Sequence, residues 1–146
     1  MADMVPVVVT GVVRGTEEEP RRERFFIEVA AAAAGDGRRL RIGVGDAEAH
    51  ALAFSLQGTE FPRPMTYQLM ASLVGAAGSA VRSVSVTSER DGVFFARVLL
   101  RGGASVDARP SDVLNLALIT GAPVHVAEGL LRVPAGSGSP GADRVP

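Results

Sequence analysis

The chain has 146 residues, of which 47% are hydrophobic, and a formal net charge of −1 at pH 7. This length allows one domain with a proper core, and the near-zero charge excludes a bulk basic field that would attract nucleic acid or an anionic membrane. The absence of cysteine excludes disulfides, thiol nucleophiles and Cys-ligated metal. No apolar run reaches the roughly 18–20 residues of a membrane span and no cationic leader opens the chain, so a soluble, cytoplasmic protein is expected.

The N-terminal third of the chain has the pattern of strands. Residues 5–13 are apolar and β-branched almost throughout, which favours a buried strand. Residues 25–32 and 38–44 predict a hairpin, with Asp36 and Gly37 as its turn signal. The intervening GTEEEPRRER segment (15–24) predicts a solvated loop and, as a second reading, an arginine patch for phosphate.

Three helices are predicted from apolar residues at helical spacing. They cover residues 46–57, 66–77 and 111–121, and Asp46 and Thr66 are the expected N-caps of the first two. The apolar positions of the second helix are assigned to the core: Leu69, Met70, Leu73, Val74 and Ala77.

Further strands complete the fold. Residues 81–87 and 93–100 alternate in polarity and predict a hairpin, and residues 123–127 and 130–133 predict two short final strands. The expected class is therefore α+β, with a mixed, largely antiparallel sheet of about eight strands packed by three helices.

One domain is expected over residues 1–133, followed by a disordered Gly/Ser/Pro tail over 134–146. Within the domain, the segments RPMT (63–66) and RPSD (109–112) are alike, since each places Arg-Pro directly before a helix. Ordinary helix capping and an internal duplication both explain this likeness.

Four separated motifs stand out along residues 42–126. In chain order they are IGVG with AEA (42–49), RPMT (63–66), GVFFA (92–96), and VDARPSD followed by LAL and GAPVHV (106–126). Together they resemble the bifunctional nuclease domain family, named for reported action on both DNA and RNA. Because four motifs must occur in the same order over roughly 40–131, the resemblance is fairly specific. It implies a nuclease that hydrolyses phosphodiester bonds in DNA or RNA and that forms a homodimer.

The matching segments carry the side chains that such hydrolysis requires. Phosphodiester cleavage needs charge stabilisation on phosphoryl oxygens, an activated water and usually a divalent metal on carboxylate ligands. The catalytic candidates are Glu48, Asp107 and Asp112 as ligands or base, with Arg109 on phosphate. The substrate-binding candidates are Arg63, Thr66, Ser111 and Asn115. The sequence does not identify the metal, although Mg²⁺ and Mn²⁺ both suit hard oxygen ligands.

A structural reading of the same residues remains open. Asp107 and Arg109 lie two apart on an extended segment and can pair with each other. Ser111 or Asp112 can cap the third helix.

A second function also remains open, because the chain departs from the family pattern after Thr66. The family commonly has His-Asp there, whereas this chain has Tyr67 and Gln68. The change removes a potential proton carrier and a potential metal ligand. It favours the alternative of a catalytically silent member that acts as a dimeric binding or assembly module, or as a sensor of phosphorylated metabolites.

Overall fold

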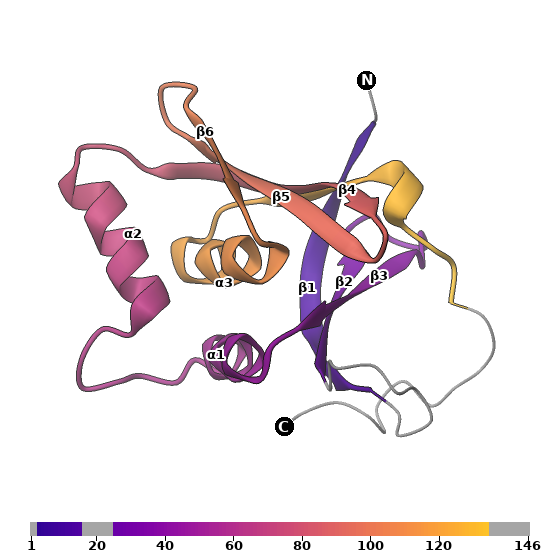
Figure 1. The fold of residues 1–146 in the computed structure, drawn as a ribbon, viewed down its shortest axis with the longest axis horizontal. Coiled ribbons are helices and arrows are strands. Elements are labelled where there is room, and N and C mark those ends of the chain that lie inside the picture. Colours follow the sequence, from indigo (N-terminus) through magenta and orange to yellow (C-terminus); the bar gives the residue numbers. More distant parts are fainter. Residues whose placement is uncertain (1–2, 16–24, 135–146) are drawn as a thin grey trace.

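A computed structural model describes residues 3–15 and 25–134 of the chain. Figure 1 shows a curled sheet with the three α-helices gathered on one side of it. The strands are β1 (Met4–Arg14), β2 (Phe25–Ala31), β3 (Arg39–Val44), β4 (Val81–Arg90), β5 (Val93–Leu100), β6 (Ser105–Ala108) and β7 (Val124–Ala127). The helices are α1 (Asp46–Leu56), α2 (Thr66–Ala76), α3 (Pro110–Thr120) and the short 3₁₀ helix η1 (Glu128–Leu130). Most of the loop predicted over 15–24 and of the tail predicted over 134–146 lies outside the described residues, at 16–24 and 135–146.

The predicted α+β class and the mixed, mainly antiparallel sheet are confirmed. The strand order is β3-β2-β1-β7-β4-β5-β6, and only the pairing of β7 with β4 is parallel. The first strand therefore pairs with the last, from Met4 opposite Ala127 to Val7 opposite Val124. The described residues form seven strands instead of about eight, and the internal duplication is not confirmed.

One predicted strand, residues 130–133, does not form. Instead of continuing β7, the chain turns through η1 and makes one isolated bridge, between Arg39 and Arg132. The segment thus lies beside the edge strand β3, but only Arg132 pairs with it. Residues 105–108, for which no strand was predicted, pair with β5 as the edge strand β6.

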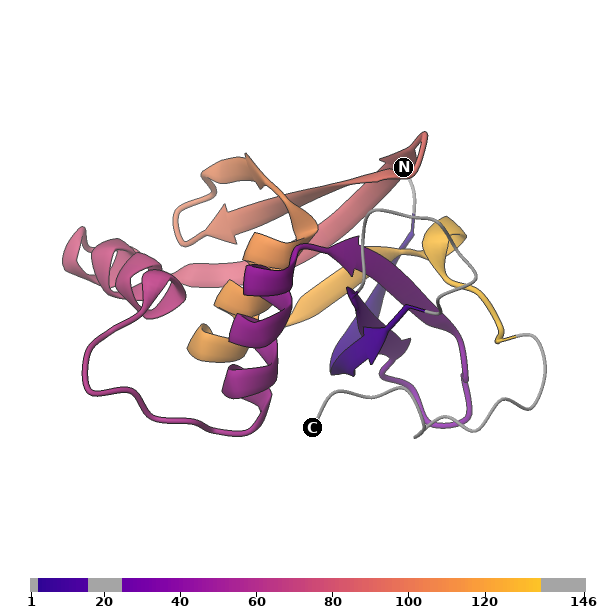
Figure 2. The same cartoon turned by 60° about the horizontal axis from the view of Figure 1, so that its bottom comes forward.

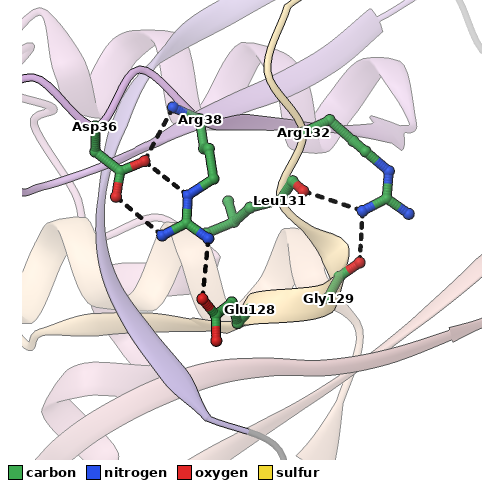
Figure 3. A network of polar contacts seen from close by, with 6 residues as sticks. All are labelled: Asp36, Arg38, Glu128, Gly129, Leu131 and Arg132. Carbon is green, nitrogen blue, oxygen red and sulfur yellow. Dashed lines mark hydrogen bonds and ion pairs between the residues drawn. The ribbon is translucent and has the colours of Figure 1, made fainter.

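Polar contacts tie this C-terminal turn to the β2–β3 hairpin (Figure 3). The Arg38 guanidinium donates to both oxygens of Asp36, at 2.7 and 2.9 Å, and reaches Glu128 at 3.3 Å. The hydrogen bonds from Arg38 hold the pKa of Asp36 below its ordinary value. Nearby, the backbones of Arg39 and Arg132 exchange hydrogen bonds of 2.8 and 2.9 Å. The end of the fold is thus fixed to its first hairpin.

The core lies between the sheet and helices α1 and α3. On α3, Val113 and Leu114 are fully buried, and Leu52 of α1 is buried to the same degree. Burying one such side chain contributes about 1.5–3 kcal/mol, so these two helices are held firmly. None of the described helices combines the length and the apolar composition needed to cross a bilayer.

The prediction that the apolar residues of α2 belong to the core is wrong. Leu69, Met70 and Leu73 are 51%, 36% and 59% exposed, and Tyr67 is the buried residue of this helix. Figure 2 shows α2 at the outer end of the molecule, beyond α1 and α3 and away from β1 to β3. Helical spacing shows that these residues share one face, but it does not show what that face covers.

The three helices begin close to where they were predicted, but with different N-caps. The cap residues are Gly45, Met65 and Arg109, all with extended backbone, so Asp46 and Thr66 are the first helical residues and not caps. In α3 the N1 position is Pro110, which tolerates this place because its missing N–H would be unpaired there anyway. The start of α3 at Pro110 moves Ser111 and Asp112 into its first turn, so neither is the N-cap.

Candidate functional site

A cluster of polar side chains forms where the first turns of the three helices meet. Glu48 comes from the first turn of α1, Tyr67 from that of α2, and Asp112 from that of α3, whose N-cap is Arg109. These residues lie up to 64 positions apart in the chain, taking the difference between Glu48 and Asp112. Helix packing therefore assembles the cluster, which we call the Arg109 cluster.

Arg109 is the centre of the cluster. Its Nε donates to Asp112 Oδ2 at 2.9 Å, and its Nη2 donates to Asp112 Oδ1 at 2.9 Å and to Glu48 Oε1 at 3.2 Å. The side chain of Arg109 is 63% exposed, whereas those of Asp112 and Glu48 are 24% and 21% exposed. Two largely covered carboxylates thus hold one edge of an exposed guanidinium in a fixed orientation.

Tyr67 completes the cluster from the other side. Its hydroxyl donates to Asp112 Oδ1 at 2.8 Å. Burial and then the hydrogen bond to Asp112 raise the pKa of Tyr67 above its ordinary value. The phenol therefore remains protonated at neutral pH and acts as a hydrogen-bond donor.

The carboxylate and the guanidinium are charged. Burial alone would raise the pKa of Asp112, but the hydrogen bonds from Arg109 and Tyr67 outweigh it and hold that pKa below its ordinary value. The same hydrogen bonds to Asp112 raise the pKa of Arg109. Asp112 is therefore an anion whose two oxygens are both occupied, which matters for metal binding.

The described residues do not form a metal site as they stand. No group of three or more His, Cys, Asp or Glu side chains in residues 3–15 and 25–134 is arranged to hold an ion. Glu48 and Asp112 meet at one place, but Arg109 occupies both oxygens of Asp112 and one of Glu48. A divalent cation would have to displace a guanidinium that already neutralises these carboxylates. The residues therefore do not fit Mg²⁺ or Mn²⁺ in this conformation.

Ser111 and Asn115 lie beneath the cluster, 6% and 0% exposed. The Asn115 amide donates to the Ser111 carbonyl at 2.9 Å and to the Glu48 carbonyl at 3.3 Å, which fastens α1 to α3. Among the described residues, no partner reaches Asn115 Oδ1. Asn115 thus fixes the backbone that carries Glu48.

The other predicted site residues lie apart from the cluster. Asp107 stands on β6 opposite Arg97, with an ion pair of 3.4 Å, and its side chain is 85% exposed. Arg63 and Thr66 are exposed before and at the start of α2, and neither side chain makes a hydrogen bond or ion pair with the described part of the chain. The expected pairing of Asp107 with Arg109 does not form, because each residue pairs elsewhere.

Sequence reasoning missed the contribution of Tyr67 and Gln68. Both were noted only as departures from the family pattern, yet Tyr67 bonds Asp112, and Gln68 Oε1 accepts from the Met65 backbone N–H at 3.1 Å to close the first turn of α2. The signal was their position directly after Thr66 in a motif of the family. What the sequence lacked was the partner, which comes from α3.

A pocket of about 150 Å³ lies beside the cluster, between α1 and the start of α2. Tyr67 belongs to both, since it lines the pocket and its hydroxyl donates to Asp112. His50 also lines it, and its Nδ1 donates to the Asp46 carbonyl at 2.6 Å. The full lining is Ala47, His50, Ala51, Phe54, Ser55, Phe61, Met65, Tyr67, Gln68 and Ile119.

The fold and the cluster define an α+β domain with an arginine–carboxylate site at the junction of three helices. Residues 31–135 match the sequence model of the bifunctional nuclease domain, and the chain belongs to this family. The resemblance drawn from the four motifs is thereby confirmed.

The chain is also similar in sequence to bacterial and plant proteins. The uncharacterized proteins Rv1829 and MT1877, from the H37Rv (ATCC 25618) and CDC 1551 / Oshkosh strains of Mycobacterium tuberculosis, are each 39% identical over 94 residues, which is 64% of this chain and 57% of each relative. Bifunctional nuclease 1 of Arabidopsis thaliana is 33% identical over 96 residues, 62% of this chain and 30% of the plant protein. The aligned part thus spans little more than half of the bacterial relatives and less than a third of the plant one.

Proposed function

We propose that this chain is a nuclease that hydrolyses phosphodiester bonds in DNA or RNA at the Arg109 cluster. The observation that carries the proposal is the exposed guanidinium of Arg109, held along one edge by Asp112 and Glu48. Because Nε and Nη2 already donate to Asp112 and Glu48, the two N–H groups of Nη1 remain to donate to the oxygens of a phosphate. Family membership and the name of the plant relative support the choice of phosphodiester.

In this proposal each residue of the cluster has a separate role. Arg109 binds the phosphoryl oxygens and stabilises the charge that develops on them. Glu48 is the general base for water. Its Oε2 lies so close to Gly45 that a Cβ on residue 45 would clash with it. Asp112 is a positioning residue that orients Arg109, and Tyr67 donates a hydrogen bond to Asp112.

The remaining candidates act outside this centre. We assign Arg63, Thr66 and Asp107 to contacts along the substrate, since all three are exposed. Ser111 and Asn115 are positioning residues, because both are buried beneath the cluster. No step is assigned to a metal, since Arg109 occupies the carboxylates that would bind it.

Cleavage of labelled single- and double-stranded DNA and RNA tests the proposal, with Mg²⁺, Mn²⁺ or EDTA present. Arg109→Ala should reduce the rate about 10²–10³-fold, as loss of a charge-stabilising donor does elsewhere. Arg82→Ala, which removes an exposed arginine on β4, is the matched control and should cleave like the parent. Equal cleavage by all three preparations would indicate a contaminating nuclease and refute this assignment. Asp107→Ala in the same series tests the outlying carboxylate.

A second function is favoured by a specific observation. Both oxygens of Asp112 are occupied by Arg109 and Tyr67, and Tyr67 replaces the residue that is commonly His in the family. In this second proposal, the chain with Asp112 occupied in this way binds a phosphorylated ligand or a protein and cleaves neither. The proposal predicts that purified protein shows no cleavage under any metal condition while its melting temperature rises with a phosphorylated ligand.

Both functions are compatible with a homodimer, for which we propose the exposed face of α2. Leu69, Met70 and Leu73 lie on this face and together form an apolar surface. A second copy of the chain would cover it and bring two clusters into one assembly.

A further inference from the structure

We infer that the pocket beside Tyr67 receives one unstacked nucleobase, whose attached phosphate lies on Arg109. The inference rests on the proposed function and deepens it, since it names the substrate class as a nucleotide with its base free of the stack. It gives the pocket a ligand that the chemistry of the Arg109 cluster alone does not specify.

The size and lining of the pocket suit one flat ring system. In another protein, an engineered apolar cavity of about 150 Å³ binds benzene. This pocket has about the same volume, 150 Å³. Ala47 and Ala51 of α1 are small lining residues that leave space, and the rings of Phe54 and Phe61, also in the lining, pack edge to face at 5.7 Å. An aromatic base gains by contact with such walls.

Polar groups at the pocket supply what a base edge requires. Gln68 uses its Oε1 for the Met65 backbone, and its Nε2 has no partner among the described residues. The Ser55 hydroxyl lines the same pocket and is likewise unpartnered within that part of the chain. A base that leaves water must exchange its hydrogen bonds for such groups, or binding loses affinity.

The pocket and the cation are joined through one side chain. Tyr67 lines the pocket and donates its hydroxyl to Asp112, which in turn accepts hydrogen bonds from Arg109. An apolar site for a ring and a cationic site for phosphate are thus linked through Tyr67 and Asp112, and a nucleotide carries its base and phosphate at two ends of one sugar. Base pairing and stacking hide the base in a duplex, so unpaired strands are the favoured substrates.

Calorimetric titration of the full chain tests the inference with three probes: a nucleoside 5′-monophosphate, the same nucleoside without phosphate, and inorganic phosphate. Ala51→Leu fills the pocket with a helix-compatible side chain, and Ala34→Leu makes the same change at an exposed turn as the matched control. Ala51→Leu should weaken nucleoside and monophosphate binding about tenfold or more and leave inorganic phosphate unchanged. Arg109→Ala should weaken monophosphate and phosphate about tenfold or more and leave the nucleoside unchanged.

Ala47→Leu, at a more exposed position of the same wall, repeats the test if Ala51→Leu does not fold. Unchanged nucleoside and monophosphate affinity in a folded wall variant would overturn the inference, as would a parent protein that binds phosphate but no nucleoside. Failure of the nuclease proposal looks different. A parent that cleaves nothing but shows the full pattern of selective losses would retain the base pocket and lose the hydrolytic step.

Discussion

Tyr67 is the single tyrosine of a chain without tryptophan, so its ionisation can be followed without any label. Burial and the Asp112 carboxylate raise its pKa above the ordinary value of 10.0. We expect tyrosinate absorbance to appear at higher pH in the folded protein than in the unfolded chain. Asp112→Asn should move the folded midpoint downward, because the neighbouring anion is removed while burial remains. A midpoint equal to that of unfolded chain would contradict the described environment.

The direction of each pKa shift also determines how the free energy of unfolding changes with pH. The folded pKa of Tyr67 lies above the unfolded one, so the folded state holds the proton more tightly. Its contribution to the free energy of unfolding is complete below about pH 10 and declines as pH rises through the folded pKa. The pKa of Asp112 is lowered instead, so its contribution is present above the unfolded value and is lost as pH falls through the folded one.

A second carboxylate is important for stability and not for the site. Glu28 on β2 is 1% exposed and accepts hydrogen bonds from Thr10, Arg39 and Arg41 at 2.9, 3.3 and 3.1 Å. We expect Glu28→Gln to lower the free energy of unfolding by about 1–3 kcal/mol, since it weakens hydrogen bonds to a charged, buried acceptor. Glu60→Gln in the exposed loop before α2 should change it little. Urea denaturation of both variants distinguishes the two positions, and equal midpoints would show that the Glu28 network contributes nothing.

How much of the site was predictable depends on where the partners of each residue lie. Glu48, Arg109 and Asp112 were selected because they sit in motifs of the family, and helix packing brings them together. Asp107 was selected for the same reason, yet it is on an edge strand and pairs with Arg97 across it. Sequence proximity to Arg109 could not reveal this, because strand pairing decided the partner.

At the scale of elements, two glycines should respond to alanine in opposite directions. Gly121 ends α3 with φ of +75°, a left-handed conformation in which a Cβ costs about 1 kcal/mol or more. Gly75 is helical and exposed within α2, with open space around its Cα, so a Cβ there removes backbone freedom from the unfolded chain.

We therefore expect Gly121→Ala to lower the free energy of unfolding by about 1–2 kcal/mol and Gly75→Ala to raise it by about 0.5–1 kcal/mol. Thermal and urea unfolding of the two variants measure both changes. A stabilising effect at Gly121 would be inconsistent with the left-handed end of α3.

The existence of the elements was largely predictable, and their surroundings were not. Periodicity placed all three helices within a residue or two of their ends, because a local pattern determines a local structure. The segment 130–133 has a strand composition, but after the 3₁₀ helix η1 it makes only one bridge, to Arg39 on the edge strand β3. The apolar face of α2 was assigned to the core because spacing alone does not distinguish a core from an interface.

For the whole molecule, the exposed face of α2 leads to a prediction about assembly. If a second copy covers it, Leu69→Glu combined with Leu73→Glu should convert a dimer into a monomer, since charge cannot be buried there unpaired. Val93→Glu, at an apolar residue 58% exposed on β5, is the control and should leave the dimer intact. Sedimentation equilibrium measures the masses. A parent protein that is monomeric at all concentrations would rule out this interface.

The order of strands is also a property of the whole molecule. The pattern of apolar and polar residues indicated which strands are buried or half-buried, but not that β1 lies between β2 and β7. The family match begins at residue 31, so β1 and nearly all of β2 lie before it, although both are interior strands of the sheet. The residue pattern of one strand does not show which strand, distant in sequence, pairs with it.

The pairing of β1 with β7 has a consequence for the time course of folding. Met4 opposes Ala127, and the connection of β3 to the other half of the sheet runs through β1 and β7. A nascent chain therefore cannot close its sheet until residue 127 has left the ribosome, and it must first close a loop of more than a hundred residues. Contacts of such long sequence separation slow folding. During synthesis, β1 and β4 therefore each have an unpaired edge until β7 pairs between them.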